Sequence, residues 1–368
     1  MDFSFSSDQQ LLKNSARAFL DEHVKPVHVR ALWDDPRGES EALWKEMAQL
    51  GWLGLALPED AGGSALGLVE TSILQEELGR AACPSPYLPT VLAATAIARF
   101  GSAAQKSRWL PAVAGGSARA TLALLERELD WSPTSVQTRA EERGGKVTLT
   151  GVKQFVPWAH VADVILIPAR VGSSVAVYAV DSSAPGVKIT PLTSMDPGMR
   201  VCTVTLDGAT VAAEARLPSE GALPFLLERG AVGAAAEMLG AARRCLDMAV
   251  EYAKVREQFG QPIGSFQAIR HKCAEMLMDV ENSHAAVYYA SWSLENGTED
   301  GSLAASVAKA YVSDASRKVC GDAIQVHGGI GFTWKYDLHL YFKRAKALEP
   351  MYGDADHHRE LIVRRVAR

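Results

Sequence analysis

The spacing of apolar residues divides the chain into three successive segments. From residue 7 to about residue 119 the apolar positions recur every three to four residues, as in LLKNSARAFLDEHV and GLVETSILQEELGRAA. This spacing predicts amphipathic helices, and Ser7 with Gln10 forms the pattern of a capping box at the start of the first one. We therefore expect a helical N-terminal domain over residues 1–119.

Between residues 120 and 220 the helical spacing gives way to short runs in which apolar and polar residues alternate. The runs include ADVILIPARV, SVAVYAVDS and VCTVTLDGATV, and Gly, Pro and Asp residues stand between them. A period of two with turn residues between the runs predicts β-strands. The segment is expected to form a middle antiparallel β domain.

The helical spacing returns from residue 221 to the end of the chain. Its segments are long, poor in proline and rich in alanine, as in AAEMLGAARRCLDMAVEYAKVREQFG. Long alanine-rich helices can approach one another closely, which is typical of a four-helix bundle. The fold class that follows is α+β and multidomain: a helical domain, a β domain and a C-terminal four-helix bundle over residues 221–368.

Composition and charge narrow the function classes. The chain has 368 residues, of which 48% are apolar and 22% charged, and its formal net charge is -5. No basic surplus is left for a polyanion, so nucleic acid is not an expected partner. The five cysteines are scattered without a CxxC pair, so neither a disulfide framework nor a zinc site is predicted. With no long apolar run and no signal-like N-terminus, the chain is expected to be cytoplasmic, without membrane insertion.

The stretch GDADHHRE resembles a metal-binding cluster at first sight. It holds Asp354, Asp356, His357 and His358 close together. Adjacent side chains on a helix point about 100° apart, so they do not converge easily on one ion. We expect a helix start here, with Asp354 or Asp356 as its cap, and no metal site.

Two other stretches suit a phosphate or an aromatic ring. In REQFG, at the end of a predicted helix, Arg256 and Phe259 are three residues apart and would share a helix face. Arginine pairs with phosphate and phenylalanine stacks on rings, although packing plus a surface charge explains the pair equally well. In QVHGGIGF, Gly328 and Gly329 would let the backbone approach a ligand, or would simply end a helix.

The order of these pieces resembles the acyl-CoA dehydrogenase family. The resemblance covers essentially the whole chain and rests on GWLGLALPEDAGG at 51–63, REQFGQPIGSFQAIRHKCAEM at 256–276 and QVHGGIGF at 325–332. It implies that FAD lies extended across a subunit interface. It also implies that an acyl-CoA thioester is oxidised to its 2,3-enoyl form, with a carboxylate as the base and an electron-transfer flavoprotein as the electron acceptor.

The resemblance carries over to one side of the flavin site. It implies that matching residues hold the pyrophosphate and adenine end of an FAD that the neighbouring subunit binds with its other residues. These candidate residues are Arg256, Phe259, Gln267, Gln325, Val326, His327, Gly328 and Gly329.

The opposite side departs from the family pattern. The Thr-Glu segment and Gly-Ser turn of the family correspond here to LLERELDWSPTSVQTRA, in which only Glu126 matches. The family's Trp-Ile-Thr becomes Phe155, Val156 and Pro157. Proline has neither a backbone N–H nor the hydroxyl of threonine, so the hydrogen bonds to the flavin edge would be lost.

Neither family position for the catalytic base holds a carboxylate. The commoner position aligns with Tyr352, which Gly353 and Asp354 follow, and the other aligns with Gly230. Tyrosine has an ordinary pKa near 10 and would be a poor base at neutral pH. Glu228 would serve only if its loop were shifted, and Asp354 starts two residues too late.

Three hypotheses remain open. The chain is the non-catalytic subunit of a heteromeric α2β2 acyl-CoA dehydrogenase, whose partner subunit supplies the base, the flavin-ring pocket and the acyl pocket. Alternatively, it is a homo-oligomeric dehydrogenase with a relocated base, Glu228 or Asp354. The third hypothesis, from another class, is a flavin-free scaffold or acyl-CoA-binding protein.

Overall fold

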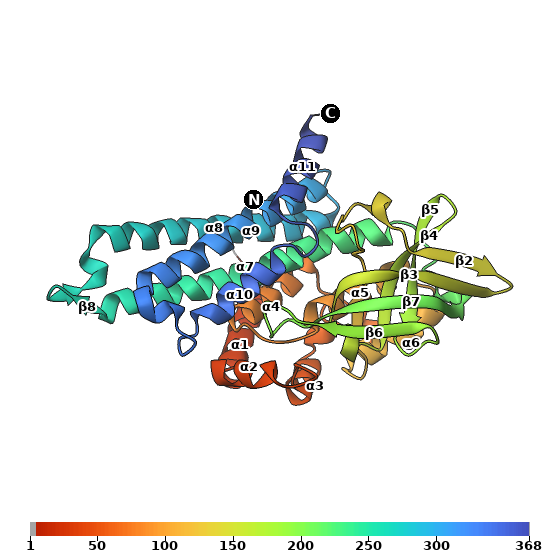
Figure 1. The fold of residues 1–368 in the computed structure, drawn as a ribbon, viewed down its shortest axis with the longest axis horizontal. Coiled ribbons are helices and arrows are strands. Elements are labelled where there is room, and N and C mark those ends of the chain that lie inside the picture. The colour runs from red at the N-terminus through yellow and green to blue at the C-terminus, as the bar shows by residue number, and fades with distance from the viewer. Residues whose placement is uncertain (1–4, 368) are drawn as a thin grey trace. The chain divides into compact units, whose positions relative to one another are not determined.

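The computed structural model describes residues 5–367 (Figure 1). The chain forms two compact units. One comprises residues up to 31, residues 68–83 and the chain from 231 onward, and the other comprises residues 32–67 and 84–230. The domain boundaries after residues 119 and 220 stay predictions.

The N-terminal third is helical, as its spacing predicts. Its α-helices are α1 (Ser7–His23), α2 (Pro26–Trp33), α3 (Glu41–Gln49), α4 (Leu68–Arg80), α5 (Tyr87–Phe100) and α6 (Ala103–Ala114).

The cap of α1 lies one residue earlier than expected. Ser6, not Ser7, is the N-cap, and its hydroxyl accepts a hydrogen bond from the Gln9 N–H at 3.2 Å. The Gln9 side chain accepts in return from the Ser6 N–H at 3.0 Å. The prediction of Ser7 and Gln10 was therefore wrong by one position. Ser6 with Gln9 and Ser7 with Gln10 both have the three-residue spacing of a capping box. Ser6 is the one that adopts the extended backbone of a cap.

The middle segment forms a seven-stranded sheet. Its strands are β1 (Ala120–Leu122), β2 (Arg139–Arg143), β3 (Lys146–Pro157), β4 (Val164–Val171), β5 (Ser174–Asp181), β6 (Val187–Leu192) and β7 (Val201–Ala212). Their order is β1-β4-β2-β3-β7-β6, with β5 paired to β4. Alternate residues such as Ile165, Ile167 and Tyr178 fill its core.

The sheet is mixed, which corrects the antiparallel expectation. β1 pairs with β4 in parallel, Ala120 opposite Val164, and β2 meets β4 in parallel through Arg139 and Arg170. The hairpins β2-β3, β4-β5 and β6-β7 are antiparallel, as is the β3-β7 pair. The alternation of apolar residues reveals strands but not their directions, and a long connection lets two strands run parallel.

The C-terminal part is a helical bundle with a final short helix. Its helices are α7 (Ala222–Val255), α8 (Gln267–Asn296), α9 (Gly301–His327), α10 (Leu338–Leu348) and α11 (Ala355–Val366). Figure 1 shows α7, α8 and α9 running side by side over much of their length. Small residues permit this approach: Ala290, Ala304, Ala305 and Ala308 pack with Val232 in one cluster. None of the helices among residues 5–367 is both long and apolar enough to cross a membrane.

Two glycines bring α4 and α7 into backbone contact. A Cβ on Gly79 would lie 2.0 Å from the Glu237 carbonyl oxygen, and one on Gly240 would lie 1.8 Å from the Glu76 carbonyl oxygen. No side chain fits at either position. The two helices therefore cross at a point where each of them has a glycine. The crossing sets Glu237, on α7, directly against α4.

Candidate functional site

The motif REQFG forms a tight hairpin after α7. Strand β8 (Glu257–Gln258) pairs with β9 (Gln261–Pro262), and the Ile263 N–H donates to the Arg256 carbonyl at 2.7 Å. Phe259 and Gly260 both have left-handed backbones, with φ of 53° and 79°. Two consecutive residues with positive φ are the mark of a type I′ hairpin turn. The expectation that Arg256 and Phe259 share a helix face was therefore wrong, because α7 ends at Val255.

Both candidate side chains of this hairpin face solvent. The Phe259 ring is 93% exposed. Arg256 is also exposed, and its guanidinium makes no hydrogen bond or ion pair with the part of the chain that the structure describes. A left-handed backbone costs a bulky L-residue roughly 1–2 kcal/mol. The Phe259 ring keeps one aromatic contact within the chain, an edge-on approach to Phe266 with 6.1 Å between the centroids.

The end of α9 presents the second candidate segment. The helix ends at His327, and Gly328 has a φ of 63°. Gln325, Gly328 and Gly329 are exposed, and a Cβ on either glycine would meet nothing within 4 Å. The backbone here is open to a ligand. Val326 faces the interior instead, since only 4% of it is exposed.

His327 lies inside the bundle, where its ring contacts residues of its own unit. Its Nδ1 is 2.7 Å from the Ala323 carbonyl oxygen, and its Nε2 is 3.0 Å from the Tyr336 hydroxyl. The Tyr252 ring stacks on it, with the centroids 4.3 Å apart. His327 therefore supports the segment from within. Its assignment to the cofactor stays a prediction, as does that of Gln267, which is exposed at the first position of α8.

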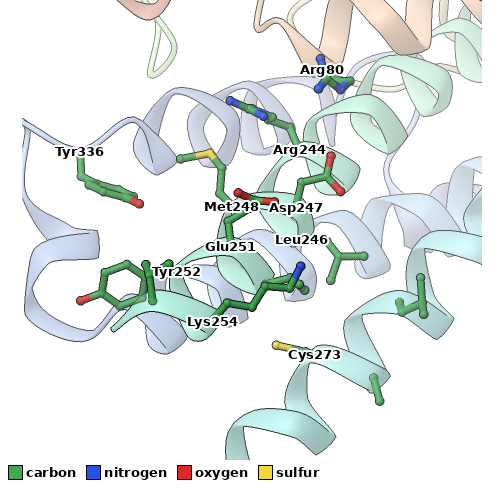
Figure 2. Close-up of a pocket in the computed structure, with 14 residues that line it drawn as sticks. Arg80, Arg244, Leu246, Asp247, Met248, Glu251, Tyr252, Lys254, Cys273 and Tyr336 are labelled. Carbon is green, nitrogen blue, oxygen red and sulfur yellow. The ribbon is translucent and has the colours of Figure 1, made fainter. Parts of the chain in front are cut away.

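A cavity of about 910 Å³ adjoins these two segments along α7. Figure 2 shows Tyr252 and Tyr336 at one end of it, and Arg244, Asp247 and Glu251 farther along. Charges of both signs line it, so it is not specialised for one kind of ion.

The ends of α7 and α9 also expose aromatic side chains. Phe332 is 78% exposed and Trp334 is 67% exposed, next in the chain to the glycine segment. The Lys343 ammonium lies 4.0 Å from the centroid of the Trp334 ring. We call Phe259, Phe332 and Trp334 together the aromatic end.

The loop that aligns with the family's base is closed. Tyr352 is only 4% exposed, although its φ is 59°. The buried Lys309 ammonium donates to the carbonyls of Glu349 and Gly353, at 2.7 Å each. The His358 Nε2 lies 2.9 Å from the Tyr352 carbonyl oxygen, so its N–H donates there. The loop is held on both sides of Tyr352 by buried hydrogen bonds.

The chemistry of Tyr352 does not suit a base. Burial, and secondly the Glu237 carboxylate, raise the pKa of the Tyr352 phenol above its ordinary value. Glu237 pairs with the Arg344 guanidinium at 2.7 Å, and Gln75 donates to its other oxygen. Arg344 also donates to the Cys83 carbonyl at 3.1 Å. Both oxygens of this carboxylate thus have hydrogen-bond partners within the chain.

The alternative base candidates have other surroundings. Gly230 is buried within α7, and Glu228 lies half-buried on the same helix two residues earlier. Asp354 caps α11 as expected, since its carboxylate accepts from the His357 N–H at 2.8 Å. Its role as a cap orients the side chain toward its own helix.

The segment that aligns with the family's Trp-Ile-Thr has an unusual backbone. Phe155 has a φ of 51° at a register shift between β3 and β7, and it is 43% exposed. Trp158 is also left-handed, yet it is buried and lies just outside β3. Pro157 is buried, and its carbonyl accepts from the Thr121 hydroxyl. No hydroxyl stands where the family has threonine.

Glu126 has internal partners as well. It accepts from the buried Lys153 ammonium at 2.7 Å, and from the hydroxyl and the N–H of Thr138 at 2.7 and 3.0 Å. Burial, although offset in part by Glu126, lowers the pKa of Lys153 to about 8. The match at Glu126 is explained by this buried pair.

Sequence reasoning missed three buried charged residues near these segments: Glu237, Lys309 and Arg344. A signal was present for one of them. Lys309 stands alone on a helical stripe with Ala305 and Val312, four residues before it and three after it. A lone lysine on an apolar stripe indicates a buried amine with carbonyl partners. The partner loop itself could not be found from the local pattern.

Comparisons with known proteins agree with the fold. Residues 6–117 match the model of the acyl-CoA dehydrogenase N-terminal domain, and residues 223–367 match that of the C-terminal domain. The acyl-CoA dehydrogenase IpdE2 of Mycolicibacterium smegmatis is 30% identical, over 95% of each chain. The acyl-CoA dehydrogenase FadE27 of Mycobacterium tuberculosis is 31% identical, over 96% of each chain.

Two solved structures are also similar. A chain of the ChsE4-ChsE5 complex from Mycobacterium tuberculosis has a TM-score of 0.94 at 31% identity, covering 100% of this chain and 99% of that one. A chain of a variant of the Tcur3481-Tcur3483 steroid ACAD has a TM-score of 0.91 at 34% identity, covering 98% of both. This chain therefore belongs to the acyl-CoA dehydrogenase family.

Proposed function

We propose that this chain is the non-catalytic subunit of a heteromeric acyl-CoA dehydrogenase, and that it supplies the adenine and pyrophosphate half of an FAD site to a catalytic partner. Membership of the family indicates FAD as the cofactor and oxidoreductase chemistry on acyl-CoA thioesters. The observation that carries the proposal is a contrast. Arg256 and Phe259 are exposed, whereas Tyr352 is buried where the base would stand.

The exposed residues fit the adenine end of FAD. The Arg256 guanidinium would form charge-assisted hydrogen bonds to the pyrophosphate, and the Phe259 ring would stack on adenine. Gly328 and Gly329 leave room for the backbone to approach the diphosphate. When bound, the flavin supplies the hydride acceptor. The partner subunit would supply the base, the flavin-ring pocket and the acyl pocket.

The similar two-chain complexes support this assembly. The names of both solved relatives describe pairs of different chains, ChsE4-ChsE5 and Tcur3481-Tcur3483. We infer an α2β2 heterotetramer of the same kind, whose substrate is a bulky acyl-CoA such as a steroid side-chain thioester. An electron-transfer flavoprotein would reoxidise the flavin.

The visible spectrum of the purified protein tests the proposal. Expressed alone, the chain should be colourless or weakly flavinylated and should not form enoyl-CoA. Co-expression with a companion dehydrogenase chain should give about half a flavin per chain, because one FAD then spans each pair of unlike subunits.

The other hypotheses give different results. One FAD per chain in a pure homo-oligomer that forms enoyl-CoA would overturn the proposal in favour of a relocated base. A protein that binds neither flavin nor acyl-CoA with any partner would be a scaffold.

A further inference from the structure

Three aromatic side chains join the ends of α7 and α9. Tyr252 is in the last turn of α7, and its ring stacks on His327, the last residue of α9, with an angle of 23° between the rings. His327 is 4% exposed. Tyr336, from the segment between α9 and α10, lies 4.7 Å from His327 between centroids.

The hydrogen bonds of His327 define its tautomer. A carbonyl oxygen only accepts, so Nδ1 carries the proton and donates to Ala323 at 2.7 Å. Nε2 is then an acceptor, and the Tyr336 hydroxyl donates to it at 3.0 Å. Burial lowers the pKa of His327, which keeps the ring neutral at pH 7. The ring is therefore held at both nitrogens and on one face.

Each of the joined helix ends leads directly into a candidate cofactor segment. The Arg256 N–H donates to the Tyr252 carbonyl at 2.9 Å, so the hairpin begins one helical turn after the stacked ring. Gly328 follows His327 in the chain. The stack thus fixes the start of the hairpin against the start of the glycine segment.

We propose that Tyr252, His327 and Tyr336 are positioning residues, a clamp that holds the hairpin of Arg256 and Phe259 against the glycine segment before FAD binds. The inference rests on the proposed function and adds to it the groups that preorganise the adenine side. Segments already fixed in place lose less conformational entropy on binding, which strengthens affinity.

Hydrogen exchange of the full-length chain without FAD tests the clamp directly. The probe is the Ile263 amide, which closes the hairpin on the Arg256 carbonyl. Tyr252→Leu removes the stack and should speed exchange at this amide about tenfold or more. Tyr252→Phe keeps the ring and is the matched control, with exchange within about twofold of wild type. Tyr336→Phe removes only the hydroxyl that binds His327. It replaces Tyr252→Leu as the test variant if that variant fails to fold, and it should also speed exchange at the Ile263 amide.

Equal Ile263 exchange in wild type, Tyr252→Leu and Tyr336→Phe would overturn the clamp. Loosening by Tyr252→Phe as large as that by Tyr252→Leu would overturn it too, because the stack would then not be the cause.

The dissociation constant of FAD from the complex with the catalytic partner is the second readout. Tyr252→Leu should raise this constant about tenfold, whereas the control Tyr252→Phe should keep it at the wild-type value. If the clamp variants loosen the hairpin while neither they nor Arg256→Ala change FAD affinity, the proposed function fails and the positioning role toward FAD fails with it. If Arg256→Ala weakens FAD but Tyr252→Leu does not, only the clamp is overturned.

Discussion

Two loops of the helical bundle differ in the contacts that their residues make within the chain. The loop around Tyr352 is closed by this chain alone, through Lys309 on one side and His358 on the other. The hairpin around Phe259 has the same left-handed backbone feature, yet its ring and the neighbouring Arg256 face solvent.

The difference separates two uses of strained backbone. At Tyr352 the left-handed backbone is accompanied by buried hydrogen bonds within the chain on both sides of the residue. At Phe259 the turn is closed by the hairpin's own backbone hydrogen bonds while the side chain stays exposed, and the proposed function assigns its cover to a ligand or another subunit. Changes at the residues of each loop test this contrast.

The largest expected effect is the loss of the carboxylate beneath the closed loop. Glu237→Leu leaves the buried Arg344 without its ion-pair partner, and breaking such a pair costs about 3–5 kcal/mol. Chemical denaturation should show a fall in unfolding free energy of about 4 kcal/mol. Glu281→Ala, which removes the exposed partner of Arg243, is the control and should cost less than about 1 kcal/mol. A loss as small as the control's would show that the loop does not depend on this network.

The next effect concerns the open hairpin. Arg256→Ala should weaken FAD binding in the complex by about 2 kcal/mol, or about 30-fold, because a phosphate loses a charged hydrogen-bond donor. Unfolding free energy without FAD should hardly change, since the Arg256 side chain makes no hydrogen bond or ion pair with the described residues, and its backbone hydrogen bonds remain in the alanine variant. Flavin titration measures the first quantity and denaturation the second. Unchanged flavin affinity would place the pyrophosphate elsewhere.

The pH dependence of the unfolding free energy also distinguishes the two loops, because only the loop around Tyr352 contains a contact to a buried histidine, His358. Burial, and secondly the charge of Lys309, lower the pKa of His358 to about 3, below its unfolded value near 6.5. The unfolded state therefore binds the extra proton first. The stability from neutral His358 is complete above pH 6.5 and is lost as the pH falls toward 3.

Between pH 6.5 and 5 this single histidine should account for a loss of about 1.5 kcal/mol. The window lies above the unfolded pKa of carboxylates, so their contribution is small. His358→Gln should flatten the dependence of unfolding free energy on pH by that amount, whereas Arg256→Ala should leave its slope unchanged. Parallel slopes for wild type and His358→Gln would mean that the ring is not buried in its neutral form.

The last prediction is that changes at the two alternative base candidates have almost no effect on turnover. Glu228→Gln and Asp354→Asn should each leave turnover of the complex within about twofold, because the proposed function assigns the base to the partner subunit. Asparagine also caps helices well, so Asp354→Asn should keep α11 intact. A turnover loss of a hundredfold or more in either variant would identify a relocated base and refute the two-subunit proposal.

Sequence patterns predicted the helices and strands well but not how they join. The spacing of apolar residues located the three helical and β segments, yet it placed Arg256 on a helix that ends one residue earlier. The turn residues Phe259 and Gly260 lack the Asn-Gly signature of a type I′ turn. Strand direction was also out of reach, because the pairing of β1 with β4 depends on contacts across the intervening hairpin.

The candidate site divides in the same manner. The resemblance named Arg256, Phe259 and the two exposed glycines as candidates, and their exposure and backbone conformation are local properties that a sequence motif can carry. Lys309 and Glu237 escaped it, because a buried charge has meaning only with its partners. Those partners lie 40 and 107 positions away in the chain, as the Lys309 bond to Glu349 and the Arg344 bond to Glu237 show.

The aromatic end has a consequence for the life of the chain before assembly. Phe259, Phe332 and Trp334 are each mostly exposed, and exposed aromatic side chains favour association with other molecules where they gather. Under the proposed function, copies made in excess of the companion subunit should therefore self-associate more than the assembled complex does. The proposed function then implies that synthesis of the two chains in equal numbers would limit this association.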